Sequence, residues 1–160
     1  MIRKVLIGIL SCSSLFADRW LSLGGGVFGI VRPHDRTPLI QIEYQPKPLL
    51  APVNWFHLTP QLGFFTNFEG AFYLYGGFRF EFLPTKWLMI TPGFAPGVYM
   101  RGHSKQLHFP LEYKSSFELA FPYKHNTRRF SVQFYHISNA SMGKRNPGTE
   151  VLVFSYVFKL

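Results

Sequence analysis

A histidine, a serine and a glutamate near the C-terminal end of the sequence have the residue types of a hydrolytic triad. His136 and Ser138 are two residues apart, and Glu150 follows after a short polar segment. A serine hydroxyl is a weak nucleophile until a neighbouring base takes its proton, and a carboxylate can orient that base. The three residues could therefore transfer an acyl group. Backbone N–H groups or the side chains of Asn139 and Asn146 could shape an oxyanion hole beside the serine.

This chemistry requires the three side chains to share one face of a β-hairpin. The hydrophobic residues of segment 129–138 fall on alternate positions, and the same parity continues to His136 and Ser138. Glu150 shares its parity with hydrophobic residues of segment 150–160. Side chains of a strand point to opposite faces in turn, so all three would project from the hydrophobic face. A His-x-Ser spacing alone is a weak signal, because it arises by chance in many chains.

Hydrophobic segments with a period of two recur along the whole chain, and turn-forming residues separate them. The proline-rich segment 46–52 is one of the expected turns, and no boundary between domains interrupts the pattern. The sequence predicts an all-β fold of eight strands, at 20–31, 39–45, 55–66, 71–82, 87–100, 112–122, 129–138 and 150–160.

Composition favours a closed antiparallel transmembrane β-barrel over a soluble β-sandwich. The chain has 18 Phe residues and only 16% charged residues, against about 25% in ordinary soluble domains. Arg79 and Lys159 lie on the less hydrophobic strand face and require water or a polar lumen. Closing the sheet removes the unpaired edges that lipid would not tolerate. Aromatic residues near strand ends are expected to form an interfacial girdle, namely Trp20, Tyr44, Trp55, Trp87 and Tyr99.

The first 17 residues are expected to be a secretory signal peptide, with a basic pair, a short hydrophobic stretch and Ala17 before the cleavage site. Cleavage leaves residues 18–160 as a single barrel domain without cysteine and with a net charge of +7. The sequence around Cys12 also resembles a lipobox, so lipidation there stays open. The positive charge fits an anionic membrane surface, and no motif for nucleic-acid binding accompanies it.

Other polar motifs give weaker signals. His103 and His108 are five residues apart in an expected loop, which is a poor arrangement for a zinc site, and no metal site is expected. The glycine run 24–26 lacks the helix and the lysine that follow a phosphate-binding loop. These glycines are better explained as small residues inside a crowded barrel.

The pattern F-x-H-x-S-N-A occupies residues 134–140, and Asn146, Gly148 and Glu150 follow it. In this motif and its spacing, the chain resembles the outer-membrane lipid A 3-O-deacylases of the acyloxyacyl hydrolase family. The local match covers roughly the last 30 residues, while the length, the signal and the strand count agree across the whole chain. Little specific sequence upstream is shared, so substrate contacts do not transfer.

The resemblance implies an eight-stranded barrel in the outer membrane that hydrolyses the ester-linked acyl chain at position 3 of lipid A. It assigns His136 as the base, Ser138 as the nucleophile and Glu150 as the residue that orients the base. It also implies that Asn139 and Asn146 help to form the oxyanion hole. Such enzymes require no metal or organic cofactor. The expected partners are lipopolysaccharide and outer-membrane lipid, without nucleic acid, and a homodimer stays open.

With a periplasmic N-terminus, odd-numbered strands run outward, which would bring the triad to the level of the outer leaflet. Lys144 and Arg145 lie in the loop between the last two strands. They would attract the phosphates of lipid A, or alternatively only solvate the loop. Two other functions are considered, an outer-membrane phospholipase-type esterase and a non-catalytic structural or adhesin barrel. A barrel without chemistry has no reason to carry these ionisable residues on its lipid face.

Overall fold

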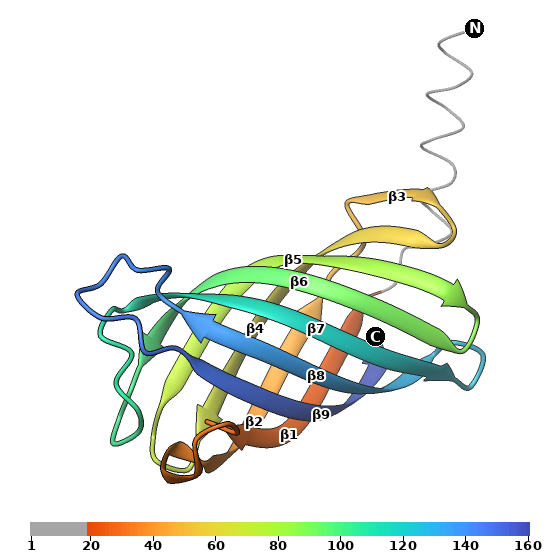
Figure 1. Cartoon of the computed structure of the whole chain (residues 1–160). Helices are drawn as coiled ribbons and strands as arrows, with labels where there is room; N and C mark the ends of the chain where they lie inside the picture. Colours follow the sequence, from red (N-terminus) through yellow and green to blue (C-terminus); the bar gives the residue numbers. More distant parts are fainter. Residues whose placement is uncertain (1–18) are drawn as a thin grey trace, which may run out of the picture.

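A computed structural model describes residues 19–160 (Figure 1), so the expected signal peptide and Cys12 lie outside the described part. Within residues 19–160, no helix is long and apolar enough to cross a membrane. The elements are β1 (Trp20–Phe28), the short 3₁₀ helix η1 (Pro33–Asp35), β2 (Thr37–Gln45), β3 (Leu50–Val53), β4 (Phe56–Asn67), β5 (Phe72–Thr85), β6 (Leu88–Met100), β7 (Leu111–Tyr123), β8 (Arg128–Ser138) and β9 (Thr149–Lys159).

Eight long antiparallel strands form a closed barrel, as the sequence predicts. Each strand pairs with the next one along the barrel, β1 pairs with β9, and the pairing of β2 with β4 completes the circle. The barrel leaves no long strand edge open to lipid.

The expected turn at 46–52 was wrong in one respect, because it contains most of the short strand β3. The pairing of β2 with β4 stops at Tyr44 and Leu62, so the first residues of β4 extend beyond β2. The β3 strand folds back onto this part of β4, with Leu50 opposite Leu58. It thereby covers a strand edge that would otherwise be unpaired. The β3 hairpin projects from one end of the barrel (Figure 1).

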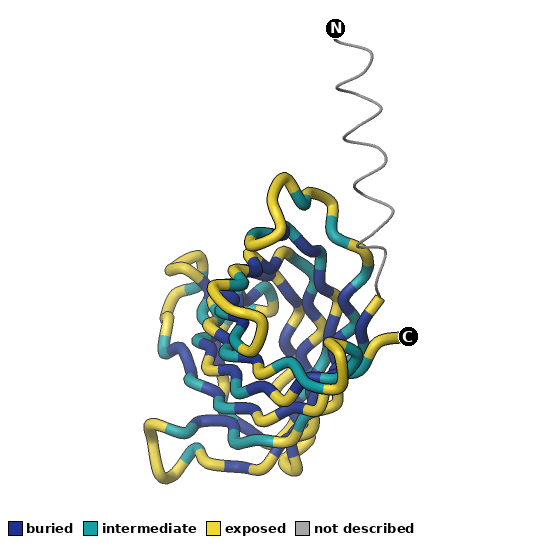
Figure 2. Tube along the Cα trace, turned by 90° about the vertical axis from the view of Figure 1, so that its right-hand side faces the viewer, coloured by how far each residue is buried: buried dark blue, intermediate teal, exposed yellow. Residues whose placement is uncertain are grey.

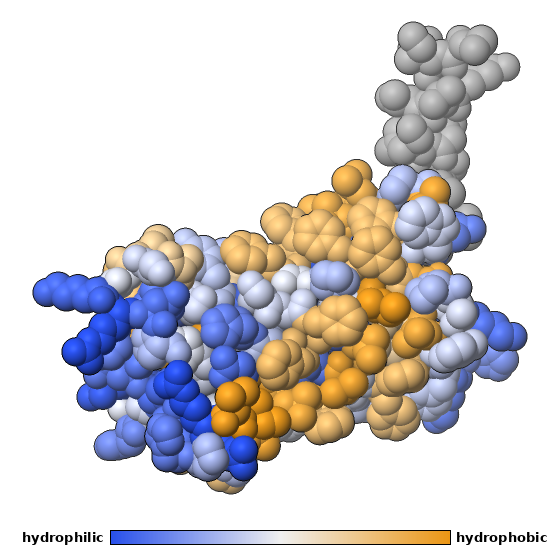
Figure 3. Space-filling model, viewed as in Figure 1, coloured by the Kyte–Doolittle hydropathy of each residue, from blue (hydrophilic) through white to orange (hydrophobic). Residues whose placement is uncertain are grey.

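Burial alternates along the strands, which confirms the predicted period of two (Figure 2). On β5, Tyr73 and Tyr75 are buried inside the barrel, whereas Leu74 and Phe78 are exposed on its outer wall. The outer wall is accordingly hydrophobic over much of its length (Figure 3). On a barrel in a membrane, this wall is the surface that faces lipid.

A network of paired charges fills the middle of the barrel. The guanidinium of Arg79 lies 2.8 Å from Glu43, 2.8 Å from Glu118 and 3.3 Å from Glu81. Lys114 Nζ lies 3.1 Å from the second carboxylate oxygen of Glu43. Buried charges are tolerated only when they are paired and hydrogen-bonded in this way. The prediction of a polar lumen around Arg79 is confirmed, and the packed interior gives the outer wall a rigid support.

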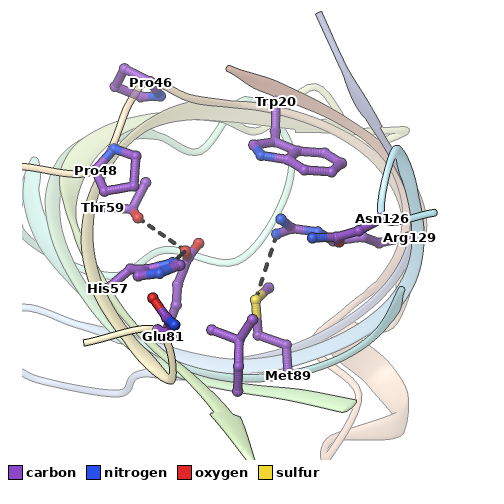
Figure 4. A pocket seen from close by; sticks show the side chains of 11 residues that line it. Trp20, Pro46, Pro48, His57, Thr59, Glu81, Met89, Asn126 and Arg129 are labelled. Atoms are coloured by element: carbon purple, nitrogen blue, oxygen red, sulfur yellow. Dashed lines mark hydrogen bonds and ion pairs between the residues drawn. The ribbon is translucent and has the colours of Figure 1, made fainter. Parts of the chain in front are cut away.

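The expected aromatic girdle was only partly right. Trp55 and Trp87 are exposed on the outside, but Trp20 and Tyr99 are buried in the lumen. The ring of Trp20 stacks against the guanidinium of Arg129, 3.6 Å from the ring centroid. Together they line a small cavity of about 80 Å³ at one end of the lumen (Figure 4). Strand parity, which turns both rings inward, overrides the preference of aromatic residues for the interface.

The two ends of the barrel differ. The longer connections, residues 29–36, 101–110 and 139–148, share one end, which we call the loop end. Short turns at 86–87 and 124–127, the β3 hairpin and the C-terminus lie at the opposite end, the turn end (Figure 1). Outer-membrane barrels have short periplasmic turns and longer extracellular loops.

Candidate active site

A histidine and a glutamate face each other across the last two strands, on the outer wall near the loop end. His136 of β8 is the direct antiparallel partner of Glu150 of β9. His136 Nδ1 lies 3.2 Å from Glu150 Oε1. Both side chains are partly exposed on the face that carries Phe134 and Phe154. The odd–even count of the sequence therefore gave the correct face for this pair.

The other edge of the imidazole, which carries Nε2, is directed toward the row of Ser138. A row here means a pair of residues that face each other on β8 and β9. If the β8–β9 register is continued by one residue, Gly148 lies opposite Ser138. A β-carbon on Gly148 would lie 2.5 Å from Cε1 and 2.9 Å from Nε2 of His136. The ring therefore leans over Gly148, with Nδ1 on the carboxylate and Nε2 toward the loop end. This orientation suits a base that serves a hydroxyl in the next row of the outer face.

Ser138 is the last residue of β8 and is half-buried on the same outer face. Among residues 19–160, no hydrogen bond joins its hydroxyl to His136. Catalytic hydrogen bonds of this kind are often long without substrate and tighten when substrate binds. The structure thus brings together His136 and Glu150, the expected base and orienting carboxylate, and holds Ser138 in the adjacent row.

Asn139 is fully buried and anchors the loop that follows the serine. Its side-chain nitrogen donates to the carbonyls of Leu107, at 3.0 Å, and Arg145, at 2.8 Å. Its side-chain oxygen accepts a hydrogen bond from the backbone N–H of Ser141 at 3.0 Å. Both amide hydrogens are thus engaged. Asn139 shapes the surroundings of the serine without offering a side-chain donor to a reacting oxygen.

Asn146 is held through its side-chain oxygen, whereas both amide hydrogens of Asn139 are engaged. Its side-chain oxygen accepts a hydrogen bond from the backbone N–H of Asn139 at 3.1 Å, which fixes the amide beside the serine. Its side-chain nitrogen has no hydrogen-bond partner within the described part of the chain. An exposed amide that is held through its oxygen can direct its N–H groups to a developing oxyanion. Of the two asparagines, Asn146 is the one free to donate.

The backbone turns sharply directly after these residues. Ala140 and Ser141 have φ values of 50° and 64°, in the left-handed region that residues other than glycine rarely adopt. The N–H of Met142 closes the turn on the carbonyl of Asn139 at 2.9 Å. Such residues cost roughly 1–3 kcal/mol each and concentrate at functional sites. The strained turn keeps the loop close to the end of β8, where Ser138 lies.

Lys144 and Arg145 are exposed at the tip of the same loop. The backbone of Arg145 is held by Asn139, as described above, while its side chain points into solvent. Hydrophilic side chains dominate this end of the molecule (Figure 3). The position is suitable for electrostatic attraction of an anionic headgroup.

The neighbouring strand β7 contributes residues that the sequence analysis missed. Tyr113 pairs with Ser138, and Ser115 pairs with His136. The ring of Tyr113 stacks on Phe94 of β6, with centroids 5.7 Å apart. An aromatic surface therefore lies directly beside the serine, where it could contact an acyl chain. The sequence predicted segment 112–122 as a strand, but not its register against β8.

A second polar cluster lies inside the barrel at the turn end (Figure 4). His57 Nδ1 is 3.8 Å from Glu81, which also accepts a hydrogen bond from the hydroxyl of Thr59 at 3.0 Å. Glu81 is bound to Arg79 as well, so this cluster continues the charge network of the lumen. Within residues 19–160, no group of three or more His, Cys, Asp or Glu side chains is arranged to hold a metal ion.

A comparison with protein families finds a match over most of the described chain. A family model described as lipid A 3-O-deacylase (PagL) matches residues 44–159, which include β8, β9 and the loop between them. No curated protein sequence matches the chain.

Three solved structures share the fold. The crystal structure of the outer membrane enzyme PagL has a TM-score of 0.69 at 16% identity, over 88% of this chain and 99% of that chain. A de novo designed transmembrane β-barrel has a TM-score of 0.61 at 10% identity, over 90% and 96% of the two chains. The outer membrane protein Ail of Yersinia pestis has a TM-score of 0.53 at 9% identity, over 90% and 99%. At these identities, the likeness establishes the barrel fold alone.

Proposed function

The chain belongs to the lipid A 3-O-deacylase (PagL) family of outer-membrane enzymes, and from this premise we propose that His136, Ser138 and Glu150 form its catalytic triad. In this proposal the enzyme removes the ester-linked 3-O-acyl chain of lipid A at the lipid-facing wall of the barrel. We also propose that residues 1–17 are a cleaved signal peptide.

One observation carries the proposal, namely the orientation of the imidazole of His136. Its Nδ1 edge contacts Glu150, and its Nε2 edge lies over Gly148, in the row of Ser138. An ionisable pair on a lipid-facing wall is costly and marks a functional site by default. The substrate explains the position, because the ester of a membrane lipid is reached from the outer wall and not from the lumen.

The first half of the reaction acylates the enzyme. Ser138 Oγ attacks the ester carbonyl carbon while His136 Nε2 takes its proton, and Glu150 stabilises the resulting imidazolium. The oxyanion of the tetrahedral intermediate accepts hydrogen bonds from Asn146 Nδ2 and from nearby backbone N–H groups. Collapse of the intermediate breaks the bond to the sugar oxygen, which receives the proton from His136. The acyl chain is now an ester of Ser138.

The second half uses water in place of the serine. His136 takes a proton from a water molecule, whose oxygen attacks the acyl carbon. When this second intermediate collapses, Ser138 regains its proton from His136, and the fatty acid is released. Glu150 returns to its starting state, and Asn139 keeps the loop in place throughout.

We place the reaction at the outer leaflet. The triad lies near the loop end, and longer loops are extracellular in barrels of this type. Lipid A carries its phosphates on the sugars to which the acyl chains are attached. Lys144 and Arg145 stand above the triad in the proposed orientation and would draw these phosphates toward the site.

Covalent labelling tests the proposed nucleophile. A long-chain alkyl fluorophosphonate should modify wild-type protein in detergent micelles at Ser138, and peptide mass spectrometry would locate the adduct. His136→Ala should slow the labelling by about 100-fold or more, because the base that activates the serine is lost. Ser115→Ala, which removes the hydroxyl opposite His136, should still be labelled at Ser138. An adduct on another residue, or labelling that does not depend on His136, would overturn the assignment.

A further inference from the structure

Exposed cations surround the turn end of the barrel. Arg19 precedes β1, Lys47 lies between β2 and β3, and Lys86 lies in the turn between β5 and β6. Lys124 follows β7, and Lys159 ends β9. All five side chains are exposed to solvent. We call this set the basic rim.

No accessible acidic side chain accompanies the basic rim among residues 19–160. The carboxylates of the inner network and its surroundings are buried in the lumen, at Glu43, Glu81, Glu112 and Glu118. The other acidic residues of the described part of the chain, Asp35, Glu69 and Glu150, lie at the loop end. Among residues 19–160, the accessible charged side chains at the turn end are therefore all basic.

An apolar groove opens on the outer wall beside this rim. It has a volume of about 460 Å³ and is lined by Trp55, Phe82, Leu83, Pro84 and Ile90. The N–H of Leu83 donates to the carbonyl of Trp55 at 2.8 Å, which ties the start of β4 to the end of β5. A volume of this order is typical of sites that bind a small organic ligand.

The surroundings of the groove are those of a membrane interface. Trp55 and Trp87 are each 58% exposed at the turn end, and tryptophans concentrate at the level of lipid headgroups. The β3 hairpin adds Leu49 and Leu50, which are about as exposed as these tryptophans. Hydrophobic side chains also cover the wall of the barrel toward this end (Figure 3). Exposed apolar side chains and exposed cations therefore lie together at the turn end.

We propose that the turn end binds an anionic phospholipid of the inner leaflet, independently of the deacylation site. The short turns of an outer-membrane barrel face the periplasm, so the basic rim meets the headgroups of that leaflet. An acyl chain occupies the groove, and Lys47 and Lys86 of the basic rim attract the phosphate. Lys86 lies between the groove residues Pro84 and Ile90 in sequence, and Lys47 lies in the connection between β2 and β3 at the same end. Five exposed cations, with no accessible acidic side chain beside them among residues 19–160, favour an anionic over a zwitterionic headgroup.

Native mass spectrometry of the full chain, released from nanodiscs of equal parts phosphatidylglycerol and phosphatidylcholine, tests this site. Wild type should retain phosphatidylglycerol in preference to phosphatidylcholine. The variant Lys47→Gln/Lys86→Gln should lose this preference by roughly fivefold for each lysine, as expected for basic side chains beside an anionic leaflet. Trp55→Ser should lower the retention of both lipids, because it removes one wall of the groove.

The matched control Arg32→Gln/Arg101→Gln removes two exposed cations from the loop end and should keep the preference. Retention of the two lipids in their bulk ratio would overturn the proposal. So would a preference that survives in the lysine variant or that disappears equally in the loop-end control. Deacylation of lipid A in detergent should stay unchanged in the lysine variant, so failure here is distinguishable from failure of the triad.

Discussion

The imidazole of His136 lies in the space that a β-carbon on Gly148 would require. Its Cε1 and Nε2 atoms would be 2.5 Å and 2.9 Å from that carbon, which is closer than non-bonded atoms approach. The contact holds the ring between Glu150 on one side and the row of Ser138 on the other. Gly148 therefore helps to set the orientation of the imidazole that we propose as the base.

Gly148→Ala should lower kcat by about 100-fold with little change in KM, since a displacement of the catalytic group of about 1 Å has an effect of that size. The methyl group would push the ring of His136 away from Ser138. Steady-state kinetics on lipid A in mixed micelles would measure both constants.

Gly70→Ala is the matched control, because Gly70 also has a positive φ, of 81°, and its added β-carbon would meet nothing closer than 4.0 Å. Alanine at Gly70 has the unfavourable energy of a positive φ, but its methyl group does not contact the imidazole of His136. Equal losses of kcat in both variants would show that backbone strain, and not the position of the imidazole, causes the effect.

Glu150→Gln should reduce kcat by between about 10²- and 10⁴-fold, as the loss of the orienting carboxylate does in related triads. The amide keeps the size of the side chain but no longer stabilises the imidazolium. Combining it with Ser138→Ala should add almost nothing to the loss from the serine alone, because residues that act as one unit are not additive. A double variant far less active than Ser138→Ala would argue that Glu150 acts elsewhere.

Asn146→Ala should cost about 10²- to 10³-fold in kcat, the effect of removing one oxyanion donor. Its exposed side chain makes one hydrogen bond, with the N–H of Asn139, so the melting temperature should fall less than in Asn139→Ala. Asn139→Ala should behave differently, because it removes three hydrogen bonds that hold the loop. We expect a loss of stability of about 1–3 kcal/mol together with the loss of activity. Thermal unfolding and kinetics on both variants would separate the two roles; unchanged kcat in Asn146→Ala would remove it from the oxyanion hole.

Reversing the charge of Lys144 and Arg145 to Glu should raise the apparent KM for lipid A micelles and leave kcat largely unchanged. Both side chains are exposed at the loop, so their attraction for phosphates should weaken as salt screens it. Kinetics at low and high ionic strength would show the wild-type advantage shrinking with salt. Equal KM values for both proteins at low salt would identify the pair as a solvated loop only.

Much of the fold could be predicted from local pattern. The period of two gave the eight long strands and the outward face of His136 and Glu150, because parity requires no knowledge of distant pairing. The short strand β3 was not predicted, because the prolines around it are typical of a turn. Its pairing with β4 depends on where β2 ends. Trp20 and Tyr99 were assigned to the aromatic girdle from their residue type alone, whereas strand parity predicts that both rings point into the lumen.

The finer geometry of the site depends on register between strands, which the sequence does not determine locally. A one-residue slip between β8 and β9 would separate His136 from Glu150, and the 139–148 loop that sets this register has no simple turn signature. The proximity of Gly148 to the imidazole follows from the same register. Tyr113 and Ser115 reach the site through pairing with β8, which only the assembled barrel reveals.

Mass spectrometry of lipid A from cells that express either wild type or Ser138→Ala tests the central claim most directly. We expect cells with wild type to lose one 3-O-linked hydroxyacyl chain from lipid A, with the mass of lipid A falling accordingly. Ser138→Ala, present at equal level in the outer membrane, should leave lipid A intact. Identical spectra from the two strains, or deacylation that persists without the serine hydroxyl, would contradict it.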